Sequence, residues 1–247
     1  VPSYHFDKAK VIVTIDADFL GSYLMPSKFT KDYAAGRSPD KKMSRLISFQ
    51  SIPSLTTLNS DDNYPIKPSQ QLAVALGLVE ALGGSLPANL KKFVDAAPVA
   101  GIKEAAAALQ AFRGESIVIA GGLQCEHANA VNLQHAVNWV NSLLGNDGRT
   151  ITAGTKLQEG TSRDLNALIS DLTEKKVKTL IIHDINPIYS LPMAAGLEEA
   201  LNNAEMVIST SNWMDETARL ADVVAPCGHT MENWNEHEFG GISTIQQ

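Results

Sequence analysis

The stretch KVIVTI, residues 10–15, decides the fold class, because this short run of β-branched and apolar residues precedes a helical stretch near 27–35 and a second apolar run, RLISF, at 45–49. Strands that alternate with helices in this way are typical of βαβ units around a mainly parallel sheet. Both runs are almost continuously apolar, as strands covered on both faces are. We therefore predict that both lie in the middle of a sheet.

The rest of the chain continues this alternation. A new strand run, SIVIAGG, stands at 116–122 after two helical stretches, and further strand runs follow at 178–184 and 205–210. The expected fold is α/β, with two Rossmann-like lobes built on mainly parallel sheets. We predict a first lobe, with a helical extension, at residues 1–113 and a second lobe at residues 114–247.

One segment interrupts the pattern of the first lobe. Residues 50–68 are rich in Ser, Pro, Asn and Asp, which is typical of a loop. A loop of this length within a compact domain is often functional or forms a contact surface. We predict a long loop there, although its sequence indicates no particular chemistry.

Composition excludes several classes of function. The 20 Lys and Arg residues are outnumbered by 27 Asp and Glu residues, for a net charge of −7, so we expect no nucleic-acid partner. No apolar run approaches the roughly 20 residues of a membrane-spanning helix, so we expect a soluble chain without a direct membrane span. The start at Val1 has neither an initiator Met nor the blocks of a signal peptide, and we expect a piece of a larger protein.

Each of the two cysteines stands two residues before a histidine, Cys125 before His127 and Cys227 before His229. Thiolate and imidazole bind zinc, but structural zinc sites place two or more residues between paired ligands. Two thiols are also too few for an iron–sulfur cluster held by four. We therefore expect no metal site, and instead a buried free cysteine with a hydrogen-bonded histidine. Cys227 would be reactive if a helix N-terminus stabilised its thiolate.

Polar and small residues follow two of the expected strands, at the edge where α/β folds bind ligands. Asp16 and Asp18 could bind a metal or a ribose hydroxyl, but a cap on the helix or turn that follows is favoured. Gly121 and Gly122 could allow a phosphate to approach the backbone, and a tight turn explains them equally well. No G-x-S-x-G nucleophile elbow is present, so we assign no catalytic residue.

Two further strings carry candidate residues. In IIHDINPIYSLP, residues 181–192, Asn186 and Pro187 form a turn directly after a strand. The asparagine could bind a ligand through its amide or fix the turn through its own backbone, and the residues leave both open. The run ENWNEHEFGG, residues 232–241, could be a partner surface or an ordered loop over a lobe.

Several of these strings, in their order, resemble the large subunits of molybdopterin oxidoreductases. HDINP at 183–187 resembles a G-x-N-P turn, and ETARLADVVAP at 216–226 resembles the family's ETA-x-x-ADVVLP. IKPSQQLA at 66–73 resembles I-R-P-G-T-D-x-A. The resemblance implies two cofactor-binding lobes whose strand ends, around Asp16, Gly121, Asn186 and Asn212, converge on a cleft. It implies cofactor-binding positions at Gly121, Gly122, Asn186, Pro187 and Asn212.

The departures from the family pattern concern the turns that would hold a pyrophosphate. Asp16, Ala17, Asp18 and Phe19 stand where the family has Gly-Ser-Asn-Pro, and Asp184 replaces the glycine of G-x-N-P. Three carboxylates would repel a phosphate, and Phe19 would crowd the first turn. The pattern is similar to the cofactor-free, molybdopterin-like subunit of alternative complex III, a quinol-oxidising respiratory complex.

This resemblance implies a fragment of a cofactor-free scaffold, with no cofactor in this chain. Its implied partners are other subunits of an electron-transfer complex and a downstream iron–sulfur domain of the same full-length protein. The implied location is the periplasmic face of a bacterial inner membrane, as a peripheral subunit. The alternative is a cofactor-binding fragment of an active enzyme that holds molybdopterin guanine dinucleotide, with a cytoplasmic location.

Overall fold

The chain divides into two compact units, Val1–Gly154 and Thr155–Gln247. The computed structural model describes residues 2–38, 43–96, 99–154, 162–191, 194–229, 232, 234–239 and 242–246. Among these residues, no helix is both long enough and apolar enough to cross a membrane.

A four-stranded parallel sheet forms the centre of unit 1. Its strands stand in the order β4 (Asp62–Pro65), β3 (Arg45–Gln50), β2 (Val11–Ile15) and β5 (Ser116–Ala120). All five residues of β2 are buried, as expected for a strand in the middle of a sheet. The chain adds β3 and β4 on one side of β2 and then returns to add β5 on the other, which makes a topological switch point between β2 and β5. The prediction of an α/β fold with a parallel sheet is confirmed.

The position of β5 changes the expected division of the chain. We predicted a lobe boundary near residue 113, because a new series of strands and helices begins there. In the structure, β5 pairs with β2 in register, Val118 beside Val13, and therefore belongs to unit 1. The two units instead divide between Gly154 and Thr155.

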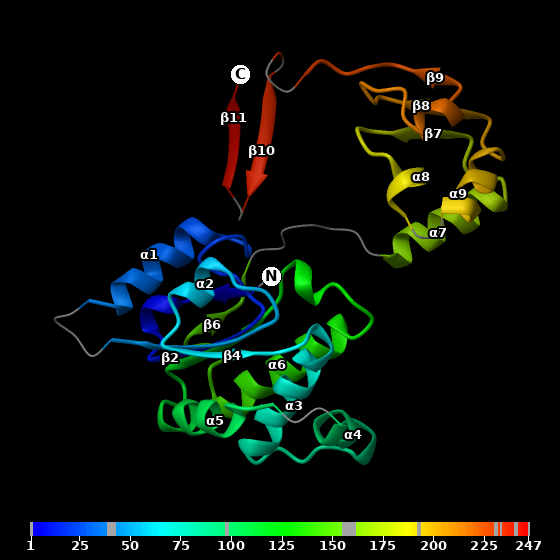
Figure 1. The fold of residues 1–247 in the computed structure, drawn as a ribbon. Helices are drawn as coiled ribbons and strands as arrows, with labels where there is room; N and C mark the ends of the chain where they lie inside the picture. The colour runs from blue at the N-terminus through cyan, green and yellow to red at the C-terminus, as the bar shows by residue number, and fades with distance from the viewer. Residues whose placement is uncertain are drawn as a thin grey trace. The chain divides into compact units, whose positions relative to one another are not determined.

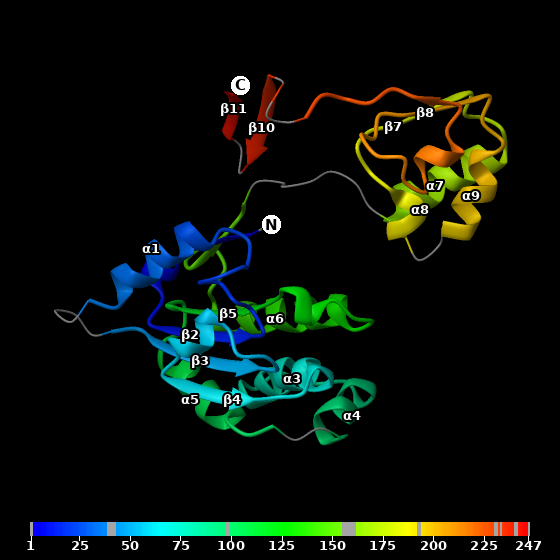
Figure 2. The ribbon, with the colours of Figure 1, turned by 45° about the horizontal axis from the view of Figure 1, so that its top comes forward.

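Helices cover both faces of the unit 1 sheet (Figures 1 and 2). One face buries α3 (Gln71–Ala81), α5 (Ile102–Ala111) and α6 (Ala130–Leu144), with α4 (Ala88–Ala96) beside them. The other face packs against η1 (Phe6–Lys8) and α1 (Pro26–Gly36) through aromatic rings. Phe6 stacks on Phe19 with ring centroids 4.3 Å apart and meets Phe29 edge-on at 5.0 Å. A short antiparallel pair, β1 (Ser3–Tyr4) with β6 (Ile151–Thr152), joins the two ends of unit 1.

The segment predicted as a long loop contains two ordered elements. These are α2 (Leu55–Leu58) and the edge strand β4. The strand has the sequence DNYP, with alternating partial burial and a proline at its end. Pro is tolerated in a strand at the edge of a sheet. Because this strand contains Pro and has no apolar run, its sequence resembles that of a loop.

Unit 2 is a smaller parallel sheet with helices on one side. The strands are β7 (Thr179–Ile182), β8 (Met206–Ser209) and β9 (Val223–Val224), in that order. Figure 1 shows α7 (Ser162–Thr173), α8 (Pro187–Ser190) and α9 (Ala194–Leu201) on one side of these strands. Their core includes Leu172, Ile182 and Leu197.

The opposite face of the unit 2 sheet carries exposed apolar side chains. Ile181 is 63% exposed, and Met206 and Val223 are each 42% exposed. The strand register aligns Ile181 with Ile208 and Ile208 with Val223, so these three side chains form a row across all three strands. Met206 stands two residues before Ile208 in β8 and therefore lies on the same face. We call Ile181, Met206, Ile208 and Val223 the open sheet face.

The C-terminal run forms a hairpin of β10 (Asn235–Phe239) and β11 (Ile242–Gln246), which pair antiparallel. It contains Trp234 just before its first strand, and that side chain is 71% exposed.

Candidate functional site

The switch point of unit 1 brings together two of the predicted segments. Asp16 directly follows β2, and Gly121 and Gly122 directly follow β5. A Cβ atom built on Gly122 would lie 3.3 Å from the backbone oxygen of Asp16. These residues therefore share the sheet edge at which doubly wound folds bind their ligands.

The Asp16 carboxylate is occupied by hydrogen bonds from its own chain. It accepts from the backbone nitrogen of Ser51 at 2.7 Å, from the Ser51 hydroxyl at 2.9 and 3.0 Å, and from the side-chain amide of Gln71. Asp16 is 9% exposed and has a left-handed backbone, with φ 52°. Its hydrogen bonds thus connect the end of β2 to the segment after β3 and to the start of α3.

Gln71 connects this carboxylate to a histidine. Its side chain is fully buried, and its amide also donates to the backbone oxygen of Gln124 at 2.9 Å. The Gln71 Oε1 lies 2.7 Å from Nε2 of His127, while the Nδ1 of His127 accepts from the backbone nitrogen of Asn129 at 3.1 Å. Nε2 therefore carries the ring proton and donates to Gln71. The family resemblance places Gln71 where I-R-P-G-T-D-x-A has its Asp, but the sequence did not predict these contacts, for which a polar residue at the start of the apolar helix QLAVALGLV was a signal.

The Asp18 carboxylate caps α2, a helix far from it in the sequence, and not the helix or turn that directly follows. Its carboxylate accepts from the backbone nitrogen of Thr56 at 2.9 Å and from the Thr56 hydroxyl at 2.8 Å, in the first turn of α2. Ser54, the N-cap residue of α2, accepts from the Thr57 backbone nitrogen at 3.3 Å. The Asp18 backbone oxygen separately accepts from the nitrogens of Gly21, Ser22 and Tyr23 in the turn that follows.

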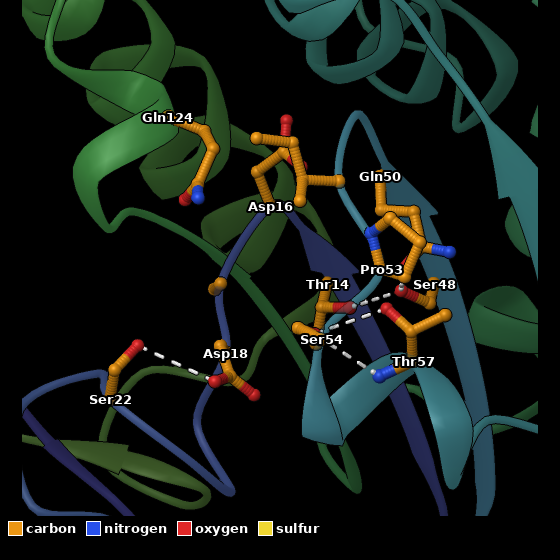
Figure 3. Close-up of a pocket in the computed structure, with 12 residues that line it drawn as sticks. Thr14, Asp16, Asp18, Ser22, Ser48, Gln50, Pro53, Ser54, Thr57 and Gln124 are labelled. Carbon is orange, nitrogen blue, oxygen red and sulfur yellow. Dashed lines mark hydrogen bonds between the residues drawn. The ribbon is translucent and has the colours of Figure 1, made fainter.

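A polar cavity of about 190 Å³ opens beside these two carboxylates, and Figure 3 shows the residues around it. Its floor is a hydrogen-bonded row in which Thr14 donates to Ser48 at 3.2 Å and Ser48 donates to Gln50 at 3.3 Å. Among the described residues, the lining includes no Lys, Arg or His. Its twelve lining residues are Thr14, Asp16, Ala17, Asp18, Ser22, Ser48, Gln50, Ile52, Pro53, Ser54, Thr57 and Gln124.

These residues do not fit a pyrophosphate. Two carboxylates line the cavity, without a cationic side chain in the described lining to offset them. At the neighbouring glycine turn, the ring of Tyr23 lies so close that a Cβ atom on Gly121 would be 2.3 Å from it. Charge and space are therefore both unfavourable to a phosphate group at this edge.

In unit 2, Asn186 caps a helix and joins two loops. Its Oδ1 accepts from the backbone nitrogen of Tyr189 at 3.4 Å and from the Thr217 hydroxyl at 2.7 Å, and its Nδ2 donates to Glu216 at 2.7 Å. The hydrogen bond from the Asn186 side-chain amide lowers the pKa of the Glu216 carboxyl group below its ordinary value. Pro187 is the first residue of α8, a position that suits its missing N–H.

Two other candidates in unit 2 follow the same strand ends. Asn212 is exposed after β8, and Asp184 follows β7 with a left-handed backbone, φ 48°. Asn186 and Asn212 thus follow neighbouring strands of one sheet, as Asp16 and Gly121 do in unit 1. That the two pairs converge on a common cleft stays a prediction.

The two cysteines differ in environment. Cys125 is 5% exposed, and burial, followed by the charge of Asp16, raises the pKa of its thiol to about 11. Cys227 is exposed. Within the described ranges, no group of three or more His, Cys, Asp and Glu side chains is arranged to hold a metal.

Comparisons with known proteins agree with this architecture. No family model matches the chain. It is 24% identical over 217 residues to the molybdopterin-binding-like subunit of menaquinone reductase from Nitratidesulfovibrio vulgaris (strain Hildenborough), with 73% of this chain and 31% of that protein covered. The chain thus spans about a third of the length of that relative.

The fold is also similar to that of acetylene hydratase from Pelobacter acetylenicus. The TM-score is 0.64 at 14% sequence identity, with 100% of this chain and 45% of that one covered. At an identity this low, the comparison shows only that the two folds are alike. The sequence match and the motifs at 183–187 and 216–226 relate this chain to the molybdopterin oxidoreductases.

Proposed function

We propose that this chain is part of a molybdopterin-oxidoreductase-like subunit that binds no pterin cofactor and acts as a scaffold in a quinone-reactive electron-transfer complex. The relative from Nitratidesulfovibrio vulgaris, a subunit of a menaquinone reductase, supports the quinone-reactive class. A role like that of the molybdopterin-like subunit of alternative complex III is the finer form of this proposal. In that form the subunit is peripheral, on the periplasmic face of the inner membrane.

The observation that carries the proposal is the replacement of glycine by aspartate at two strand ends. Asp16 and Asp184 have φ values of 52° and 48°, a backbone that favours glycine, at the positions where the family resemblance expects glycine. This pattern is what we expect of cofactor-site turns that keep their backbone shape but carry a carboxylate in place of a neutral residue. Each carboxylate beside a phosphate costs on the order of 1 kcal/mol at a partly solvated site, so Asp16 and Asp18 in unit 1, and Asp184 in unit 2, each oppose a phosphate at their own strand end.

The open sheet face of unit 2 supports the scaffold role. Parallel sheets are normally covered on both faces, yet Ile181 and its neighbours are exposed here. The match covers only 31% of the relative, so most of that protein lies outside it. We propose that another part of the same subunit covers this face. Further subunits, and an iron–sulfur domain of the same polypeptide, would be the partners in electron transfer.

The test is the cofactor content of the complete subunit, purified from its own cells in its native complex. Molybdenum and tungsten are measured by elemental analysis, and pterin by fluorescence after acid oxidation. An active molybdopterin oxidoreductase from the same cells is the positive control. We expect neither metal nor pterin in stoichiometric amount. One pterin dinucleotide per subunit would contradict the proposal and support the cofactor-binding alternative.

A further inference from the structure

Tyr23 lies directly against the glycine turn at the switch point of unit 1. A Cβ atom built on Gly121 would lie 2.3 Å from its Cε2 atom, 2.9 Å from Cζ and 3.0 Å from the hydroxyl oxygen. The Tyr23 hydroxyl donates to the backbone oxygen of Ala120, the last residue of β5, at 3.4 Å. The ring therefore covers the point where β5 ends.

The turn after β2 holds Tyr23 in this position. The backbone nitrogens of Gly21, Ser22 and Tyr23 all donate to the backbone oxygen of Asp18, at 3.1, 2.9 and 2.9 Å. The Tyr23 ring also packs against the aromatic core on this face of the sheet. Burial raises the pKa of its hydroxyl above the ordinary value, so the group remains a protonated donor to Ala120.

This contact gives Gly121 a role inside the fold. In a dinucleotide site, glycines after the first strands leave room for a phosphate to reach backbone N–H groups. Here the ring of Tyr23 takes up the room above Gly121, and any side chain on Gly121 would collide with it. Glycine is thus required at this position both by its backbone, with φ 154°, and by the tyrosine ring.

We infer that Tyr23 is a built-in occupant of the switch point, which closes the glycine turn to phosphate independently of the carboxylates. This inference rests on the proposed function, because it explains how a cofactor-free unit keeps the turns of a cofactor site. Asp16 and Asp18 oppose a phosphate by charge, whereas Tyr23 excludes it by volume. Removal of the charge alone therefore leaves the turn closed.

The binding test separates the two effects by calorimetric titration with GDP. Asp16→Asn/Asp18→Asn is the neutral background, and Tyr23→Ala or Tyr23→Phe is added to it. We expect GDP to bind at least about tenfold more tightly when Tyr23→Ala is added. The Tyr23→Phe addition is the matched control, since it keeps the ring and should leave binding unchanged.

The outcomes distinguish this inference from the proposed function. Micromolar binding of GDP to the unmodified chain would contradict the proposed function. Binding to the neutral background with Tyr23 intact, or a folded Tyr23→Ala form that gains no affinity, would overturn the inference and leave the proposed function standing.

A ligand-free test uses the contact itself, through a double-mutant cycle. Gly121→Ala should lower the unfolding midpoint in the unmodified chain, because the new methyl group meets the Tyr23 ring. In a Tyr23→Ala chain the same change should lower it less, because only the backbone strain at φ 154° remains. Equal losses in the two chains would show that the ring does not occupy this space.

Discussion

Asp16 and Asp184 each have a left-handed backbone within two residues of the end of a parallel strand, Asp16 after β2 and Asp184 after β7. They differ in what their side chains hold. Asp16 accepts hydrogen bonds from Ser51 and Gln71, whereas Asp184 is placed by its backbone nitrogen, which donates to the Thr210 hydroxyl at 3.3 Å. One aspartate therefore organises its loops, and the other mainly tolerates a strained turn.

Glycine at these two positions should have opposite effects on stability. Asp184→Gly removes the left-handed strain and should raise the free energy of unfolding of unit 2 by up to about 1 kcal/mol. Asp16→Gly removes one of the two acceptors of the buried Gln71 amide and the acceptor of the Ser51 donors, and it should lower the free energy of unfolding of unit 1 by about 1 to 3 kcal/mol. Hydrogen exchange followed by mass spectrometry reports each unit separately. A loss of protection in unit 2 with Asp184→Gly would contradict this account.

Gln71 should be the most sensitive polar residue of unit 1. Gln71→Leu removes one donor to the Asp16 carboxylate and leaves the Nε2–H of His127 without its acceptor, and we expect a loss of about 2 to 4 kcal/mol. Gln110→Leu is the control, because Gln110 is exposed on α5 and contacts only Arg113 in the hydrogen bonds described. Urea unfolding monitored by circular dichroism measures both. Similar midpoints for the two variants would show that the buried network adds no stability.

The stability of unit 1 should fall at alkaline pH, partly because of Cys125. Burial raises its thiol pKa from 9.0 to about 11. Between these values the unfolded chain loses the proton that the folded chain keeps, so the free energy of unfolding decreases as pH rises, by about 1.4 kcal/mol per unit from this group. Below pH 9 the contribution is complete.

Serine variants of the two cysteines test this effect by urea unfolding at several pH values. Cys125→Ser should lose less stability between about pH 9 and 11 than the unmodified chain. Cys227→Ser should behave like the unmodified chain, since that thiol is exposed. Tyr4 and Tyr33, whose pKa values burial also raises, supply an alkaline loss common to all three proteins. Identical pH profiles for the two variants would rule out a role for Cys125.

Two neighbouring residues of β7 should differ strongly in how much a polar substitution destabilises unit 2. Ile182 is buried in the unit 2 core, so Ile182→Thr should cost about 2 kcal/mol or more. Ile181→Thr, on the open sheet face, should change stability by less than about 0.5 kcal/mol and reduce binding of the apolar dye ANS. If Ile181→Thr destabilises unit 2 as much as Ile182→Thr does, the face is already covered within this chain.

The parts of the fold that could be predicted from the sequence are those set by local pattern. The apolar runs at 10–15, 45–49 and 116–122 predicted three buried strands, and helix positions followed from their apolar periodicity. The pairing of β5 with β2 could not be predicted in this way, because strand order depends on contacts between residues about a hundred positions apart. The polar edge strand β4 carried no pattern at all.

The site was predictable only as a location. Asp16 and Gly121 each follow a strand, so each was expected at a ligand-binding strand end, but in different lobes. Only the pairing of β5 with β2 places both at one edge of one sheet. Their partners Ser51, Gln71 and Tyr23 come from segments whose sequences indicate a loop, a helix and a turn, and only the folded chain brings them together.

The most direct test of the central claim is a calorimetric titration of the unmodified chain with GDP, which represents the nucleotide half of molybdopterin guanine dinucleotide. Micromolar affinity corresponds to about 8 kcal/mol of binding free energy, which a closed and negatively charged switch point does not provide. We predict no saturable heat up to millimolar GDP. Micromolar binding that is lost on Asn186→Ala would contradict the account.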